Sequence, residues 1–171
     1  VLISFLGTND YIPCNYYFDK DRSLKIDNLR FIQEALLKLL CTGWNSEDRI
    51  IVFLTEDAEK KNWIDTVYET GEPKSGLDTV LKSMKLKPQI LSPRIKEGYS
   101  ESDIWDIFET VFSQLNDNDE LILDITHSFR SIPMLGLVLL NYARVLKNIT
   151  VKGIYYGAFE KLGPSYFVKE N

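Results

Sequence analysis

The sequence predicts one α/β domain with a mostly parallel sheet and helices on both faces. The chain has 171 residues, which is the length of a single domain. Residues 49–55 form a nearly continuous apolar run, which is typical of a strand covered on both faces in a parallel sheet. Other strand-like runs alternate with helical patterns, and this alternation produces βαβ units.

The first half of the chain is expected to begin with a buried strand at residues 1–6, because these residues are apolar and turn-forming residues follow them. We expect a helix that has Asp27 as its N-cap and ends near 41–43, since Ile26 and Phe31 have the spacing of a hydrophobic staple. The other expected elements are a hairpin around 16–18, a strand at 49–55, weaker helices at 56–68 and 76–84, and a short strand at 89–91.

The second half contains the best amphipathic pattern of the chain, a helix expected from Ser100 to about residue 115. Its apolar residues recur at helical spacing and include Trp105, which we expect in the core. Ser100 followed by Asp103 resembles a capping box, which indicates where this helix starts. The remaining expected elements are a strand at 120–126, an apolar helix at 133–146, a strand at 149–156 and an edge strand around 166–168.

Composition and charge exclude several classes of protein. The net charge of −5 leaves no bulk positive field that could bind duplex DNA. Two cysteines and one histidine are too few for a disulfide scaffold or a zinc site, so we expect no metal, no cofactor and a reducing, cytoplasmic location. No apolar run is long enough for a membrane span. Because the chain begins at Val1, we expect it to be part of a longer protein.

Two loops that follow expected strands carry polar residues suited to a ligand, and ligands of parallel sheets bind beyond the carboxyl ends of the strands. The first loop is Gly7-Thr8-Asn9-Asp10, and the second is residues 124–131. The second loop combines hydroxyls, one guanidinium and the free N–H groups of the next helix, which together favour an anion. These donors are Thr126, Ser128, Ser131 and Arg130. The sequence therefore predicts local anion binding in an acidic protein.

Each of these residues also has a structural explanation. Gly7 and Thr8 lack the G-x-G-x-x-G spacing of dinucleotide folds, so they equally suit a simple turn. Asp124 is interpreted as structural support, because such a carboxylate readily accepts backbone N–H bonds. His127 could form a structural hydrogen bond or contact the ligand. Arg130 could form a surface ion pair or bind an anion. Three tyrosines could either pack in the core or hairpin or stack on the bases of a ligand: Tyr11, Tyr16 and Tyr17.

The second loop also resembles a known motif. Residues 124–130, Asp-Ile-Thr-His-Ser-Phe-Arg, are similar to the D-x-T-H-G-F-R motif of CRISPR-associated Rossmann-fold (CARF) sensor domains, with Ser128 in place of the usual glycine. Three further stretches agree in the same order, so the resemblance covers nearly the whole chain: 5–8, 11–17 and 154–160. The resemblance implies a Rossmann-like three-layer sandwich.

The resemblance further implies that the domain binds cyclic tetra- or hexa-adenylate, the second messenger of type III CRISPR antiviral defence. Binding would occur at a homodimer interface and would control, allosterically, a C-terminal effector domain outside this chain. The ligand-binding residues that it implies are Gly7, Thr8, Asn9, Asp10, Thr126, His127, Ser128, Phe129, Arg130 and Ser131.

Two other functions stay open at this point. Some domains that share the motif also cleave their ligand as metal-independent ring nucleases, and Thr8, Ser128 and Arg130 would then be the catalytic residues. A generic Rossmann-like nucleotide binder, such as an oxidoreductase, is disfavoured by the missing glycine fingerprint.

Overall fold

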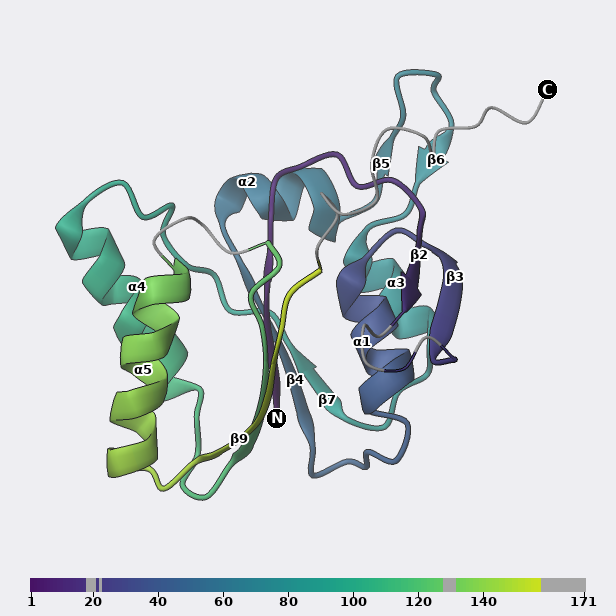
Figure 1. Ribbon diagram of the computed structural model, residues 1–171. Helices are drawn as coiled ribbons and strands as arrows, with labels where there is room; N and C mark the ends of the chain where they lie inside the picture. The colour runs from purple at the N-terminus through teal and green to yellow at the C-terminus, as the bar shows by residue number, and fades with distance from the viewer. Residues whose placement is uncertain (18–20, 22, 128–131, 158–171) are drawn as a thin grey trace.

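The computed structural model describes residues 1–17, 21, 23–127 and 132–157 (Figure 1). At its centre is a five-stranded sheet in which every pair of neighbouring strands is parallel. The order of strands across the sheet is β7-β4-β1-β8-β9. These strands are β1 (Leu2–Leu6), β4 (Arg49–Leu54), β7 (Gln89–Leu91), β8 (Glu120–Asp124) and β9 (Thr150–Tyr155).

Helices cover both faces of this sheet, which confirms the predicted three-layer α/β arrangement (Figure 1). One pair of helices lies on each face: α1 (Ile32–Leu40) with α3 (Leu77–Ser83), and α4 (Glu101–Ser113) with α5 (Ile132–Leu146). Alternate residues of β1 enter two separate cores, since Leu2 packs with the first pair and Ile3 with the second. Within the described residues, no helix is long and apolar enough to cross a bilayer.

Two hairpins and a short helical segment lie beside the sheet. The segment consists of α2 (Glu56–Ala58) and the π-helical turn η1 (Glu59–Trp63), and it lies at the edge where β1 and β4 end (Figure 1). The hairpins pair β2 (Cys14–Tyr17) with β3 (Lys25–Leu29) and β5 (Thr66–Val67) with β6 (Pro73–Lys74). The helix expected at 56–68 therefore ends at Trp63.

The prediction that Asp27 caps the first helix is wrong. Asp27 lies within β3, and α1 begins at Ile32 with Phe31 as its N-cap. Because β3 pairs with β2, the backbone of this segment forms hairpin hydrogen bonds in place of a first helical turn. Asn28 has a φ of 58°, a left-handed conformation that a right-handed helix does not accept.

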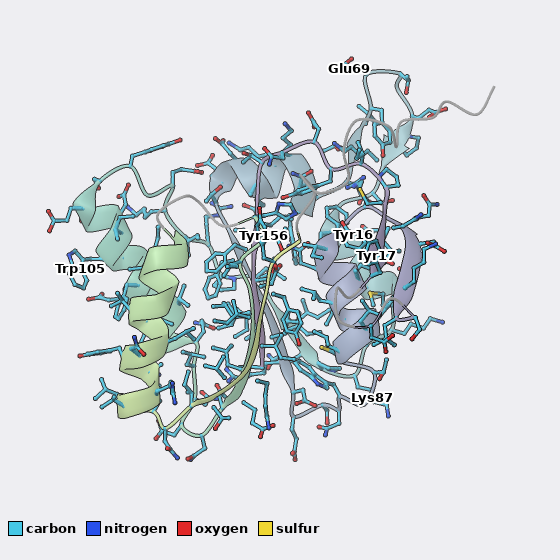
Figure 2. The ribbon with its side chains drawn as sticks, viewed as in Figure 1. Tyr16, Tyr17, Glu69, Lys87, Trp105 and Tyr156 are labelled. Atoms are coloured by element: carbon cyan, nitrogen blue, oxygen red, sulfur yellow. The ribbon has the colours of Figure 1, made fainter. Side chains whose placement is uncertain are left out.

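The prediction that Trp105 lies in the core is also wrong. Its side chain is 58% exposed and points away from the sheet (Figure 2). The face of α4 that packs on the sheet consists of Ile107, Phe108 and Val111. The predicted start of this helix is confirmed, since the Ser100 hydroxyl accepts a hydrogen bond from the Asp103 N–H at 3.1 Å. The edge strand expected around 166–168 lies outside the described residues.

The close packing of α3 against η1 gives a prediction. A Cβ added at Gly76 would lie 2.0 Å from the Trp63 carbonyl oxygen. We expect Gly76→Ala to lower the free energy of unfolding by about 2 kcal/mol or more, because backbone cannot rotate away from the clash. At Gly43 a Cβ meets open space, so Gly43→Ala should change that free energy by less than about 0.5 kcal/mol. Urea unfolding of both variants measures the difference, and equal effects would contradict this packing.

Candidate ligand site at the end of the central strands

The two loops predicted to bind a ligand leave the sheet at the point where its strand order reverses. From β1 the chain continues through β4 and β7 on one side, and it later returns through β8 and β9 on the other. Neighbouring strands β1 and β8 are thus followed by connections that run in opposite directions. Open parallel sheets bind their ligands beyond the strand ends at such switch points.

The structure brings the two loops into contact. A Cβ added at Gly7 would lie 3.2 Å from the His127 Cβ and 3.5 Å from the His127 carbonyl oxygen. The Tyr11 hydroxyl would lie closer still, at 2.9 Å. Gly7 therefore allows the two loops to approach closely, because a larger residue would push His127 or Tyr11 aside.

Tyr11 holds the first loop from the interior. Its hydroxyl accepts a hydrogen bond from the Gly7 N–H at 2.8 Å, and its ring lies 4.4 Å from the His127 ring and 5.6 Å from the Phe31 ring between centroids. The side chain is buried, so Tyr11 packs in the core. Tyr16 also packs against the core, whereas Tyr17 is 45% exposed beside it on the hairpin (Figure 2).

Asp124 anchors the second loop, as its structural interpretation predicts. The side chain is fully buried at the end of β8 and accepts hydrogen bonds from the Ser4 hydroxyl at 2.6 Å and from the Thr126 N–H at 3.0 Å. Burial raises the pKa of this carboxyl, and the bonds from Ser4 and Thr126 oppose that rise. The Gln33 amide donates to the Ser4 hydroxyl at 2.9 Å, so α1 joins the same network.

Thr126 connects this network to the end of β9. Its hydroxyl donates to Asp124 at 2.6 Å and accepts from the Gly157 N–H at 2.8 Å. A hydroxyl has one proton to donate, so Thr126 gives its proton to Asp124. A Cβ added at Gly157 would lie 3.0 Å from the Thr126 methyl carbon, which shows how closely the two segments approach.

Asn62 is a residue of the site that the sequence analysis missed. Its side chain is fully buried, and its amide donates to the carbonyl oxygens of Gly7 and Asn9, both at 2.9 Å. The first loop is thus held on one side by Tyr11 and on the other by Asn62. The π-helical turn η1 carries Asn62, and such turns are frequent at functional sites.

The electrostatics of the first loop depend on Asp10 and two lysines. The Asp10 carboxylate lies 3.3 Å from the Lys61 ammonium and 3.6 Å from the Lys74 ammonium. The hydrogen bond and charge of Lys61, followed by the charge of Lys74, hold the pKa of Asp10 below its usual range. Lys61 belongs to η1 and Lys74 to β6, so three elements meet here.

His127 is neutral at neutral pH. Burial lowers the pKa of its imidazole to about 4, because the charged form loses its hydration. The ring is half-buried against Tyr11. It therefore contributes no positive charge that would attract an anion, and its polar role is that of a neutral donor or acceptor.

Six of the ten predicted ligand residues are described, and they meet at one end of the sheet. Thr8, Asn9 and Asp10 have exposed side chains, whereas Gly7 and His127 form the contact between the loops and Thr126 bonds to Asp124 and Gly157. The other four, at 128–131, lie outside the described residues. Among the residues that the structure describes, potential metal ligands do not gather in groups of three or more.

These features define a Rossmann-like α/β domain whose ligand site would lie at the switch point of a parallel sheet. Residues 1–160 match the family described as "CRISPR system endoribonuclease Csx1, CARF domain". The chain therefore belongs to the family of Csx1 CARF domains.

One curated relative matches part of the chain. The chain is similar to "CRISPR-associated protein MJ1674" from Methanocaldococcus jannaschii, with 48% identity over 69 residues. This match covers 39% of the chain and 11% of the relative, so the chain corresponds to a small part of that longer protein.

The lowered pKa of His127 gives a prediction of pH-dependent stability. The unfolded chain binds a proton near the ordinary pKa of about 6.5, whereas the folded chain binds it only near 4. The wild type should therefore lose stability, relative to His127→Gln, as the pH falls from about 6.5 toward 4. The extra loss should approach about 1.4 kcal/mol per pH unit. Denaturant unfolding at several pH values measures it, and parallel pH profiles for the two proteins would show that the imidazole is not buried.

Proposed function

We propose that this domain is a sensor of cyclic oligoadenylate, which it binds as a homodimer to control a fused effector in type III CRISPR antiviral defence. The main support is the contact between Gly7 and His127, because it joins the two loops that the CARF resemblance assigns to the ligand. Those loops leave β1 and β8 at the switch point, where the fold favours a ligand.

The residues of the site fall into two groups: some hold the loops in place, and others are exposed and could contact the ligand. The Gly7 N–H bonds to Tyr11 and the Thr126 hydroxyl proton bonds to Asp124, so we assign both residues to shaping the site. Exposed Thr8 and Asn9 are free to contact the ligand from the first loop. On the second loop we assign phosphate and ribose contacts to 128–131, with Arg130 as the charged donor. A polyanion would thus meet local donors despite the net charge of −5.

An exposed apolar stripe on α5 supports the homodimer. Val138, Tyr142 and Val145 recur at i, i+4 and i+7, so they share one face of the helix, and they are 60%, 51% and 82% exposed. Contiguous exposed apolar surface commonly marks a protein interface. An isologous pair through α5 would place two copies of the second loop, which leads directly into α5, around one symmetric ring.

The same helix offers a route for allosteric control. Because the second loop leads into α5, a ring that fixes this loop would bias the position of α5 in the dimer. Such a bias changes the activity of a fused effector only under one condition. The ring must bind the dimer arrangement in which the effector is active more tightly than the arrangement in which it is inactive. We therefore assign α5 to transmission and the effector's chemistry to residues outside this chain.

Titration calorimetry with cyclic tetra-adenylate and cyclic hexa-adenylate tests the proposed function. We expect one of the rings to bind with a stoichiometry of one ring per two chains. Arg130→Ala should reduce the binding free energy by about 1.5–3 kcal/mol, as loss of a charge-assisted phosphate contact does. Lys82→Ala, which removes an exposed cation on α3, should leave affinity unchanged. If neither ring binds to the wild type, the sensor function is wrong.

The calorimetry samples also separate the ring nuclease alternative from the sensor. After prolonged incubation in EDTA, the ligand is resolved by chromatography. An intact ring supports a sensor without catalytic activity, whereas linear products that require Thr8 or Arg130 would support a metal-independent ring nuclease.

The homodimer has its own prediction. Val145→Asp places a charge in the proposed interface and should convert the dimer to a monomer in sedimentation velocity, because a desolvated, unpaired carboxylate is costly. Val67→Asp is the matched control, since Val67 is 67% exposed on β5, away from α5. Identical sedimentation of both variants and the wild type would exclude a dimer through this face of α5.

A further inference from the structure

The cations beside the first loop are more numerous than the anions that pair with them. Among the ion pairs of the described residues, Asp10 is the one carboxylate shared by two ammonium groups, those of Lys61 and Lys74. The neighbouring Lys60 illustrates the usual pattern, since it pairs with Glu56 alone. The cluster therefore carries a local positive charge within an acidic protein.

Lys74 is held in place to an extent that is unusual for a lysine. Its side chain is 10% exposed, although lysine is almost never buried unless it is paired. The ammonium lies 5.5 Å from the centroid of the Tyr68 ring and 3.6 Å from Asp10. That distance exceeds the 2.7–2.9 Å typical of a charge-assisted hydrogen bond, so Asp10 satisfies Lys74 only loosely.

The hairpin that carries Lys74 is fixed to the body of the domain. The Arg30 guanidinium donates to the Ser75 carbonyl oxygen, next to Lys74, and to the Tyr68 hydroxyl at 3.5 Å. It also lies over the Phe31 ring, 4.3 Å from its centroid. The β5–β6 hairpin extends beyond the sheet on the same side as the first loop, and Glu69 lies at the tip of this hairpin (Figures 1 and 2). The Lys74 ammonium is thus positioned before any ligand arrives.

The Asp10 side chain, by contrast, can rotate away from the two lysines. Its side chain is 75% exposed, and the loop before it is already held by Asn62 through the carbonyls of Gly7 and Asn9. Rotation of the Asp10 side chain would therefore not disturb the loop. An exposed ion pair is worth little, so a better anion can displace this carboxylate at small cost.

We infer that Lys61 and Lys74 form a phosphate subsite of the ligand site, which the Asp10 carboxylate occupies in the free protein. This inference rests on the proposed function for the identity of the ligand, a cyclic oligonucleotide. A phosphate group offers several charged oxygens, so it can contact both ammonium groups at hydrogen-bonding distance. When phosphate enters, Asp10 rotates toward solvent. Asp10 is then a built-in competitor of the ligand, and no covalent step is involved.

The test compares variants of the subsite with a matched control. We choose Asp10→Asn, Lys61→Met, Lys74→Met and the control Lys60→Met, which removes the adjacent exposed lysine of η1. Each protein is titrated with cyclic tetra-adenylate, cyclic hexa-adenylate and inorganic tripolyphosphate at several salt concentrations. Tripolyphosphate tests the cations without a base or a ring. Thermal unfolding confirms that each variant is folded, and the exposed Lys61 keeps the test valid if Lys74→Met fails to fold.

The inference predicts opposite effects for the carboxylate and the lysines. Asp10→Asn should bind ring and tripolyphosphate about two- to fivefold more tightly, because the competing charge is gone. Lys61→Met and Lys74→Met should each bind at least about tenfold more weakly. In each lysine variant the slope of log affinity against log salt should become shallower by about 0.7, the amount expected for one lost phosphate contact, while Lys60→Met keeps the wild-type slope.

Failure of this inference can be told apart from failure of the proposed function. If the wild type binds a ring but Lys61→Met and Lys74→Met match Lys60→Met, the subsite is wrong and the sensor function stands. Weaker ring binding by Asp10→Asn would likewise overturn the subsite, because Asp10 would then be a direct contact. If no protein binds a ring but tripolyphosphate binding rises in Asp10→Asn and falls in the lysine variants, the subsite stands and the sensor function is wrong. Absence of both kinds of binding overturns both.

Discussion

Asp124 buries a carboxylate completely at the end of β8, and a buried charge is costly unless hydrogen bonds replace the water that it loses. The Ser4 hydroxyl and two donors of Thr126 replace that water. Since Ser4 lies on β1 and Thr126 on the loop after β8, the same bonds tie the two strands at the switch point together. Because the Asp124 carboxylate needs donors from both Ser4 and Thr126, these bonds fix the position of Thr126 where the second loop leaves the sheet.

The position of the first loop follows from the position of the second. His127 comes directly after Thr126, and it packs against Tyr11 and close to Gly7. Tyr11 and Asn62 then satisfy both polar groups of the Gly7 backbone. The Gly7 backbone is therefore engaged internally, whereas the side chains of Thr8, Asn9 and Asp10 are exposed. A ligand that bound beyond these strand ends would meet loops already held in place, which would lower the entropic cost of binding.

The sequence predicts the order of the main strands and helices because buried parallel strands and amphipathic helices have distinct periods. It places the start of α1 wrongly, because the pairing of β3 with β2 replaces the helical turn that Asp27 would have capped. Trp105 fits the helical period but lies just outside the face that α4 buries, and period alone does not give the width of that face.

The sequence identifies two loops that lie close together in the structure, but it misses residues that hold them in place. Gly7 and His127 approach closely, as expected for loops that follow neighbouring parallel strands. Asn62 is not predictable from helical spacing, because a π-helical turn changes which residues face inward. Lys74 resembles an ordinary surface lysine in the sequence, and only the fold of its hairpin covers it. Both residues belong to tertiary contacts that local patterns do not contain.

The central claim is that one ligand contacts the loops after β1 and β8 together, at the switch point. Amide chemical shifts of the isotope-labelled protein, recorded during titration with cyclic tetra-adenylate or cyclic hexa-adenylate, test it most directly. We predict that signals from 7–10 and 125–131 shift together and saturate at the same ligand concentration. Shifts confined to other parts of the domain, such as the face of α1 and α3, would contradict the claim.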